Sequence, residues 1–329
     1  MPSDLYLGVD GGQSTTVAVL LSADGAIVGT GVGGPANHIH EPGGVSRIKK
    51  SIRDAVGGAL RSAGVEKWEV LQSYFGMTGS SPEMESLCRE ALPDLPIMLG
   101  HDSEIALMST TLGGPGLAVI GGTGSVAIAR DGDGRTVRAG GWGYLMGDEG
   151  SAYWIALRAL EQIAMAADGR VEPTPMLEYS AQILKVDPDA EAIHRLLYGK
   201  GVARVDLARI SEGVWRAASD GDQPAADILR EAGVLLGMLG GHVIAELGVS
   251  AEHVVVGMVG GVFRAEPFVR EAFSEVVQGV ASRAKIVYPR VPASVAAGLL
   301  AMQSMGKGLS VDSLLNLEVA AAQHKDLKR

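Results

Sequence analysis

The sequence has only one cysteine, Cys88, among its 329 residues. A single thiol excludes an intramolecular disulfide and any iron–sulfur cluster that needs several thiolates from one chain. Positive charge is also scarce, because 28 Lys and Arg residues stand against 38 Asp and Glu, for a net charge of -10. This balance argues against nucleic acid or an anionic membrane as a partner. We expect a protein of the reducing cytoplasm.

Long uninterrupted apolar runs are missing as well. The longest weakly charged stretch, residues 232–249, is broken by five glycines, His242 and Glu246, so we expect a buried helix there and no membrane span. The first four residues, Met-Pro-Ser-Asp, are not the start of a basic region followed by an apolar one, and we expect no signal peptide. The chain is long enough for two domains, each with its own core.

Glycine, by contrast, is abundant at 46 residues, and two glycine turns follow short apolar runs in the same way. Residues 9–15 read Val-Asp-Gly-Gly-Gln-Ser-Thr, and residues 119–125 read Val-Ile-Gly-Gly-Thr-Gly-Ser. Glycine has no Cβ and tolerates positive φ, so consecutive backbone N–H groups can converge on one anion. Either turn alone could be an ordinary hairpin. Together they predict two phosphate-binding hairpins in two related domains.

The two turns differ from known phosphate motifs and from each other. No Lys follows the glycines, which excludes a Walker A loop, and a strand instead of a helix follows each turn, which excludes a dinucleotide fingerprint. The first turn carries Asp10 where the second has Ile120. One carboxylate beside phosphate oxygens suits Mg²⁺, so we expect Asp10 to lie on the metal side of the site.

The hydrophobic pattern predicts similar elements in both halves of the chain. Strands are expected over residues 5–9, 16–22, 26–32, 70–77 and 97–100, with helices over 45–63, 82–92 and 103–112. In the second half strands are expected over 117–121, 125–130, 136–140, 254–258 and 286–288, with helices over 151–167, over most of 171–250, over 267–280 and at the end.

This pattern indicates an α/β fold of two related domains with mixed β-sheets, flanking helices and an interdomain cleft. The glycine-rich break at 113–116 marks the boundary, which gives domains over 1–112 and 113–309. The last helix, 310–329, is a candidate to pack on the first domain.

Two places could supply chemistry. Asp102 directly follows a predicted strand, where it could be a plain helix N-cap or a general base for a hydroxyl that attacks the γ-phosphate. The loop over residues 140–151 gathers glycines around Trp142 before Asp148 and Glu149. Carboxylates in such a loop can cap the next helix, or can accept paired hydrogen bonds from vicinal sugar hydroxyls. Asn37 could join the same ligand, although a loop Asn is usually a turn former.

The run 140–156, which ends Gly-Asp-Glu-Gly-Ser-Ala-Tyr-Trp-Ile-Ala, resembles the signature of the N-acetylglucosamine kinases. These belong to the BadF/BadG-type ATPase group, with glucosamine kinases and dehydratase-activating ATPases, and have the actin and hexokinase type of ATPase fold, which is ribonuclease H-like. Residues 10–12 resemble the family's first phosphate motif, 120–125 its second and 256–263 its adenosine motif.

The resemblance implies a role for each matching residue. Asp102 would be the catalytic base and Asp10 the metal-binding carboxylate. The implied sugar pocket comprises Asn37, Thr78, Gly79, Asp102, Gly141, Gly143 and Asp148. The implied ATP contacts are Gly11, Gly12, Gln13, Ser14, Thr15, Gly122, Thr123, Gly124, Ser125, Gly260 and Gly261. Gln13 and Ser14 depart from the family, which often has Gly and Thr there.

The resemblance further implies a cytoplasmic, homodimeric ATP-dependent kinase that transfers the γ-phosphoryl of Mg-ATP to the 6-hydroxyl of N-acetylglucosamine. The alternatives are a glucosamine kinase or another hexose kinase of the same family. A dehydratase-activating ATPase needs at least two thiolates from each chain for its shared cluster, and Cys88 alone does not supply them. A non-catalytic sugar sensor would have no need of Asp102.

Overall fold

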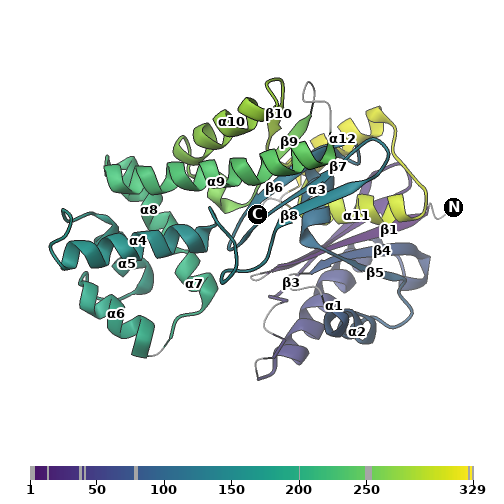
Figure 1. Cartoon of the computed structure of the whole chain (residues 1–329). Coiled ribbons are helices and arrows are strands. Elements are labelled where there is room, and N and C mark those ends of the chain that lie inside the picture. The colour runs from purple at the N-terminus through teal and green to yellow at the C-terminus, as the bar shows by residue number, and fades with distance from the viewer. Residues whose placement is uncertain are drawn as a thin grey trace. The chain divides into compact units, whose positions relative to one another are not determined.

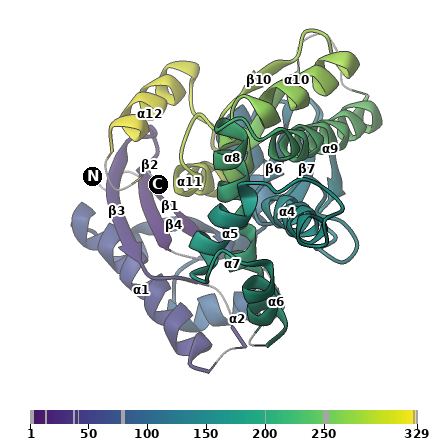
Figure 2. The ribbon, with the colours of Figure 1, turned by 90° about the vertical axis from the view of Figure 1, so that its left-hand side faces the viewer.

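Two five-stranded mixed sheets with the same strand order form the framework of the protein (Figures 1 and 2). The structure is a computed structural model, and it describes residues 4–12, 15–36, 39–40, 42–77, 81–199, 201–248, 254–324 and 327. The chain divides into unit 1, Met1–Gly114 with Pro289–Arg329, and unit 2, Pro115–Tyr288. The expectation of two α/β domains with mixed sheets is confirmed.

The sheet of unit 1 has the order β3-β2-β1-β4-β5. An antiparallel meander is formed by β1 (Leu5–Gly11), β2 (Thr16–Ser22) and β3 (Ile27–Gly33), and β4 (Val70–Met77) and β5 (Ile97–Gly100) continue the sheet in parallel with β1. All residues of β2 are buried, as are all of β1 except the half-buried Asp10. Strands covered on both faces need apolar side chains on both faces, which explains this composition.

Helices cover both faces of this sheet. Leu5, Leu7 and Val9 point into one core, with α1 (Gly44–Ala63) and α2 (Pro82–Ala91), while the alternate residue Tyr6 joins the core on the other face. That second core is formed by α3 (Asp102–Thr111), α11 (Ala293–Ser304) and α12 (Val311–Gln323). A short 3₁₀ turn, η1 (Lys67–Glu69), leads into β4.

Unit 2 repeats the framework with more helices. Its sheet has the order β8-β7-β6-β9-β10, with β6 (Gly116–Gly121), β7 (Ser125–Arg130) and β8 (Thr136–Gly140) as the meander and β9 (Val255–Val259) and β10 (Lys285–Val287) as the parallel extension. Its helices are α4 (Ala152–Ala167), α5 (Met176–Leu184), α6 (Ala190–Gly199), α7 (Arg204–Ala208), α8 (Ile210–Ser219), α9 (Gln223–Leu247), η2 (Gly261–Arg264) and α10 (Phe268–Val280).

The most apolar helix is a core element. Among the described residues α9 alone is long and apolar enough to cross a membrane, and 56% of its most apolar 18-residue window is buried within the protein. Gly237 of α9 lies against Val276 of α10, and Gly240 lies against Val119 of β6. The expectation of a buried helix over residues 232–249 is thus confirmed as far as Gly248. Most other elements match their expected ranges within one or two residues.

Two details differ from the sequence-based expectations. Asp102 does not cap α3, because His101 holds the extended backbone of the N-cap and Asp102 is the first helical residue. Residues 289–309, which were expected in the second domain, lie in unit 1. The reason is close packing of α11 on β1, since a Cβ on Gly8 would overlap the carbonyl oxygen of Ser294.

Candidate active site

Asp10 and Asp102 lie at the same edge of the sheet in unit 1. Asp10 is the last residue but one of β1 and is in register with Gly76 of β4, which is in turn in register with Gly100 of β5. Adjacent strands are about 4.8 Å apart, so the backbones of Asp10 and Gly100 are separated by roughly 10 Å. Asp102 follows Gly100 by two residues, at the start of α3. Two carboxylates, one near the end of β1 and one at the start of α3, therefore lie at the same edge of the sheet.

The electrostatics of this edge favour a cation. Burial and, to a lesser extent, the nearby charge of Asp102 together raise the pKa of Asp10 from 3.8 to about 6. Asp10 is half-buried, whereas Asp102 is exposed to solvent. This edge of the sheet therefore carries one half-buried carboxyl, that of Asp10, and one exposed carboxyl, that of Asp102. Their different environments suit two different roles.

The first turn of α3 is anchored to β4. The hydroxyl of Tyr74 donates a hydrogen bond to Oε2 of Glu104, and Ile105 packs over Gly76. Tyr74 and Gly76 share one face of β4 because side chains alternate along a strand. This contact anchors the helical turn that carries Asp102, and it was not predicted from the sequence. The alternation on β4 was a signal that could have placed Tyr74 beneath α3.

The first glycine turn is a closed hairpin. The amide of Gly12 donates to the carbonyl of Thr15 at 2.9 Å, and the amide of Ala36 donates to the carbonyl of Gly12 at 3.0 Å. Gly11 ends β1 against the side chain of Met77. The predicted site residues that lie outside the described part of the chain are Gln13, Ser14, Asn37, Thr78 and Gly79.

A hollow of about 380 Å³ in unit 1 opens beside Asp10 and Thr15. Arg290 also lines it and forms a two-point ion pair with Glu318 of α12, through Nη2 at 2.8 Å and Nε at 3.2 Å. The amide of Arg290 donates to the carbonyl of Ser109 at 2.8 Å. Sequence reasoning did not select Arg290, because no local pattern links it to the first hairpin.

In unit 2 the second glycine turn and the loop over residues 140–151 form one assembly. Ser125 makes three of the contacts, because its amide donates to Oδ1 of Asp148 at 3.0 Å, its hydroxyl donates to the carbonyl of Glu149 at 2.8 Å, and its carbonyl accepts from Gly141 at 2.9 Å. The amide of Ala152 adds a bond to the carbonyl of Gly122 at 2.9 Å. The predicted phosphate hairpin and the predicted sugar loop are therefore directly bonded to each other.

Asp148 is the centre of this assembly. Its backbone is left-handed with φ at 64°, and only 4% of the residue is exposed. Its Oδ2 pairs with Arg204 of α7. A Cβ on Gly124 would lie 2.7 Å from the carboxylate, so the hairpin needs glycine there for the carboxylate to approach. Each carboxylate oxygen has a protein partner and still retains capacity to accept another hydrogen bond.

Three of the six predicted nucleotide residues of unit 2 line one hollow of about 640 Å³, and Gly124, Ser125 and Gly260 are not part of its lining. Gly122 and Thr123 line one side, and Gly261 lines another, after the parallel neighbour strand β9. Gly260 has φ at 103°, and a Cβ there would overlap the carbonyl of Gly121, so this turn approaches the hairpin backbone closely. The remaining wall includes Glu212 and Trp215 of α8 and Arg264 of η2, which sequence reasoning did not identify.

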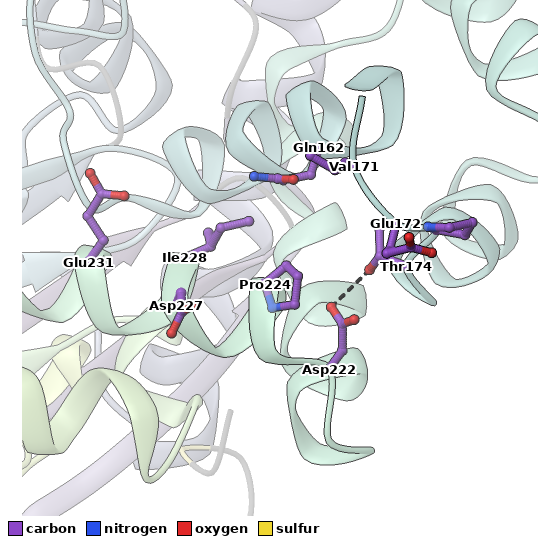
Figure 3. Close-up of a pocket in the computed structure, with 10 residues that line it drawn as sticks. Gln162, Val171, Glu172, Thr174, Asp222, Pro224, Asp227, Ile228 and Glu231 are labelled. Carbon is purple, nitrogen blue, oxygen red and sulfur yellow. Dashed lines mark hydrogen bonds between the residues drawn. The ribbon is translucent and has the colours of Figure 1, made fainter. Parts of the chain in front are cut away.

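A separate hollow of about 470 Å³ in unit 2 is shown in Figure 3. Its lining carries four carboxylates, Glu172, Asp222, Asp227 and Glu231. Asp222 caps α9 and accepts a hydrogen bond from the Thr174 hydroxyl at 2.9 Å, which is the dashed line in Figure 3. The negative charge of these four carboxylates disfavours a phosphate in this hollow.

No cluster of three or more His, Cys, Asp or Glu side chains capable of holding a metal ion occurs among the described residues. Mg²⁺ does not require one, because it commonly uses one or two carboxylates together with water and phosphate oxygens. Asp10, with its negative neighbour Asp102 and with no ion pair among the described residues, fits this kind of site.

Known proteins resemble the chain over most of its length. An N-acetylmuramic acid/N-acetylglucosamine kinase of Clostridium acetobutylicum is 27% identical over 85% of this chain and 92% of its own. A glucosamine kinase of Vibrio cholerae is 26% identical over 69% of this chain and 76% of its own. A solved structure from Chromobacterium violaceum, described as an N-acetylglucosamine kinase, is 26% identical with a TM-score of 0.71 and covers 91% of this chain and 99% of its own.

These similarities confirm the expected fold, which is that of sugar kinases of the actin and hexokinase type. Residues 7–301 match the BadF/BadG/BcrA/BcrD ATPase family, a range that includes both glycine hairpins, both carboxylates of unit 1 and the Asp148 assembly. The chain belongs to the BadF/BadG/BcrA/BcrD ATPase family.

Proposed function

We propose that this protein is an ATP-dependent amino-sugar kinase that transfers the γ-phosphoryl group of Mg-ATP to the 6-hydroxyl of N-acetylglucosamine. The observation that carries the proposal is the bonding of the second glycine hairpin to the Asp148 loop, beside the hollow lined by Gly122, Thr123 and Gly261. A phosphate site and a sugar site that share Ser125 suit a reaction that joins the two substrates.

The nucleotide occupies the hollow of unit 2 in this proposal. Its volume, about 640 Å³, is within the range of small-molecule sites. Trp215 and Glu212 offer an aromatic ring and a carboxylate for the adenosine, while Gly122, Thr123, Gly124 and Ser125 lie toward the phosphates. The first hairpin, with Gly11, Gly12, Gln13, Ser14 and Thr15, is the candidate phosphate-binding turn of unit 1.

Asp10 holds the magnesium ion in this proposal. A magnesium ion held by Asp10 would supply positive charge that offsets the negative charge of the transferred phosphoryl group. A cation would also favour the ionised form of Asp10, whose pKa is raised to about 6 without one. A bound metal ion would thus stabilise the ionised carboxylate of Asp10.

Asp102 accepts the proton of the attacking 6-hydroxyl. Its side chain is exposed and therefore accessible, and the helical turn that carries it is anchored by the hydrogen bond between Tyr74 and Glu104. Since a loose phosphoryl transition state needs little covalent help, positioning of the hydroxyl and charge stabilisation provide most of the rate.

The candidate sugar contacts in unit 2 are Asp148, Gly141 and Gly143, and the family resemblance adds Asn37, Thr78, Gly79 and Asp102 as candidates in unit 1. A buried carboxylate that accepts from sugar hydroxyls loses its partners when they are missing, which makes Asp148 a determinant of the sugar class. Tyr144, Leu145 and Met146 are exposed and offer apolar surface for an acetamido methyl. Free glucosamine is the alternative acceptor, and N-acetylmuramic acid is a third, taken from the name of the Clostridium relative.

The test is a coupled ADP-release assay with Mg-ATP over glucose, glucosamine, N-acetylglucosamine, N-acetylmannosamine and N-acetylmuramic acid. The proposal expects sugar-dependent ADP release with the highest kcat/KM for N-acetylglucosamine. A kcat/KM for glucosamine at least tenfold higher, which corresponds to about 1.4 kcal/mol of transition-state binding, would overturn the choice of N-acetylglucosamine as the acceptor. The assignment as a kinase would still stand. The absence of release with every sugar would overturn the kinase. The homodimer that the family resemblance implies is part of the proposal and is measured by light scattering.

A further inference from the structure

Arg204 joins the second hairpin to the sugar loop from a third element. It is the first residue of α7, and its Nη2 donates to the carbonyl of Thr123 at 3.1 Å while pairing with Oδ2 of Asp148. One nitrogen therefore contacts both the hairpin predicted to bind phosphate and the carboxylate predicted to bind sugar. Asp148 is 56 residues distant in sequence, so no local pattern predicts this contact.

Two tyrosines hold the guanidinium group in place. The carbon Cζ of Arg204 lies 5.1 Å from the ring centroid of Tyr144 and 5.4 Å from that of Tyr153, and the two rings meet edge to face at 5.3 Å. Cation–π contacts of this kind orient the planar guanidinium as well as stabilise it. Tyr144 belongs to the sugar loop and Tyr153 to the first turn of α4. A shift of either segment would therefore change the ring contacts of Arg204.

The burial of the pair makes this contact important to Asp148. The Asp148 side chain is 5% exposed and that of Arg204 is 35% exposed. A buried carboxylate that loses its cation keeps an uncompensated charge, which is strongly unfavourable. Without Arg204, the described partner of the Asp148 side chain would be the Ser125 amide. The position of Asp148 and the path of the hairpin thus both depend on Arg204.

We propose that Arg204 is a positioning residue that couples the sugar site to the phosphate site. This inference rests on the proposed kinase function and extends it. When a sugar hydroxyl bonds to Asp148, the carboxylate holds its orientation through Arg204, and Arg204 in turn holds the carbonyl of Thr123, which aligns the hairpin for the nucleotide. The converse must hold to the same degree, because a coupling free energy between two sites is reciprocal. Arg204 itself makes no contact with the reacting atoms in this scheme.

The coupling is measurable by calorimetric titration of N-acetylglucosamine, with and without a saturating non-hydrolysable ATP analogue and Mg²⁺. In the wild type we expect the analogue to tighten sugar binding at least fivefold, a typical size for coupled sites. In Arg204→Met, which keeps the length and apolar contact of the side chain, we expect the ratio to fall below twofold. In Arg204→Lys, which keeps the charge without the planar fork, we expect an intermediate ratio.

Arg195→Met is the matched control, since Arg195 lies on α6 in exposed ion pairs with Asp189 and Glu191. Its ratio should equal that of the wild type. A merely structural role of Arg204 would lower the melting temperature and leave the ratio unchanged, which would overturn the inference. A wild-type ratio of one would overturn it as well. If Arg204→Met does not fold, a ratio in Arg204→Lys equal to that of the wild type would overturn the inference.

These outcomes are distinguishable from failure of the proposed function. If the wild type releases ADP with an amino sugar, but the ratio measured for Arg204→Met equals that of the wild type, the kinase function is supported. The role of Arg204 in coupling is then overturned. A wild-type protein that neither binds nor phosphorylates any amino sugar overturns both.

Discussion

The charge of Asp102 acts on Asp10 across the carboxyl edge of the first sheet and, together with the larger effect of burial, raises the pKa of Asp10 to about 6. The two residues are 92 positions apart in the sequence, but only one strand, β4, lies between β1 and β5 in the sheet. A carboxyl in this position binds a proton more readily in the folded protein than in the unfolded chain, where its pKa is near 3.8.

This relationship predicts how stability depends on pH. Between about pH 4 and pH 6 the folded protein holds a proton on Asp10 that the unfolded chain has released, so the free energy of unfolding falls as pH rises through this window. Asp10→Asn does not titrate. In urea denaturation without Mg²⁺, we expect the variant to gain stability relative to the wild type as pH rises from 4 to 6, and to keep that gain above pH 6. Parallel pH profiles for the two proteins would contradict this.

Replacement of Asp102 tests the base. Asp102→Asn keeps the size of the side chain but removes proton acceptance, so we expect kcat to fall by a factor of about 10² to 10⁴. The Kd for the sugar, measured by calorimetry, should change little. A variant with nearly normal turnover would remove Asp102 from the role of base. Asp94→Asn, at an exposed position before β5, provides a control with the same change of chemistry.

The two glycines of the second hairpin should respond differently to a methyl group. At Gly124 a Cβ would lie 2.7 Å from the Asp148 carboxylate, whereas at Gly122 the nearest atom is 4.0 Å away. We expect Gly124→Ala to weaken binding of both the sugar and ATP analogues. Gly122→Ala should leave sugar binding unchanged. Equal sugar affinities in the two variants would show that the hairpin does not control Asp148.

Close packing of α11 on β1 predicts a loss of stability on substitution at Gly8. A Cβ there would overlap the carbonyl oxygen of Ser294 and the amide of Gly298, both backbone atoms. Overpacking of this kind typically costs about 1 to 3 kcal/mol, so Gly8→Ala should lower the free energy of unfolding by that amount or more. Gly279→Ala on α10 is the control, because no atom lies within 4 Å of its added Cβ and alanine favours a helix by up to about 1 kcal/mol. Urea denaturation of both variants measures the contrast.

The framework was predictable from the sequence because its signals are local. The meander over residues 5–33 and its counterpart over 116–140 follow from apolar runs separated by glycine turns, and the helix α1 follows from its apolar spacing. The partners of α11 were not predictable, because its small apolar residues fit either sheet and only the close approach at Gly8 selects unit 1.

The residues of the candidate site likewise divide into those that could be predicted from the sequence and those that could not. The sequence predicts the turns and strand ends beside Asp10, Asp102 and Asp148, so the positions of these three residues could be predicted. Arg204, Tyr74 and Trp215 could not, because each contributes through a contact with a residue remote in sequence. The cap at His101 was missed because the sequence alone does not distinguish an N-cap from the first residue of a helix.

The common strand order of the two sheets points to a history. One ancestral half, copied once, would leave two sheets with identical order, one glycine turn in each, and freedom to diverge elsewhere. In unit 1 the crossover after the meander carries α1 and the short η1, while in unit 2 the same crossover carries the helices α4 to α9. Growth at that point left both frameworks intact. The crossover is therefore the part of the framework in which the two units differ most in length, and in unit 2 its added helices carry Arg204, Glu212 and Trp215.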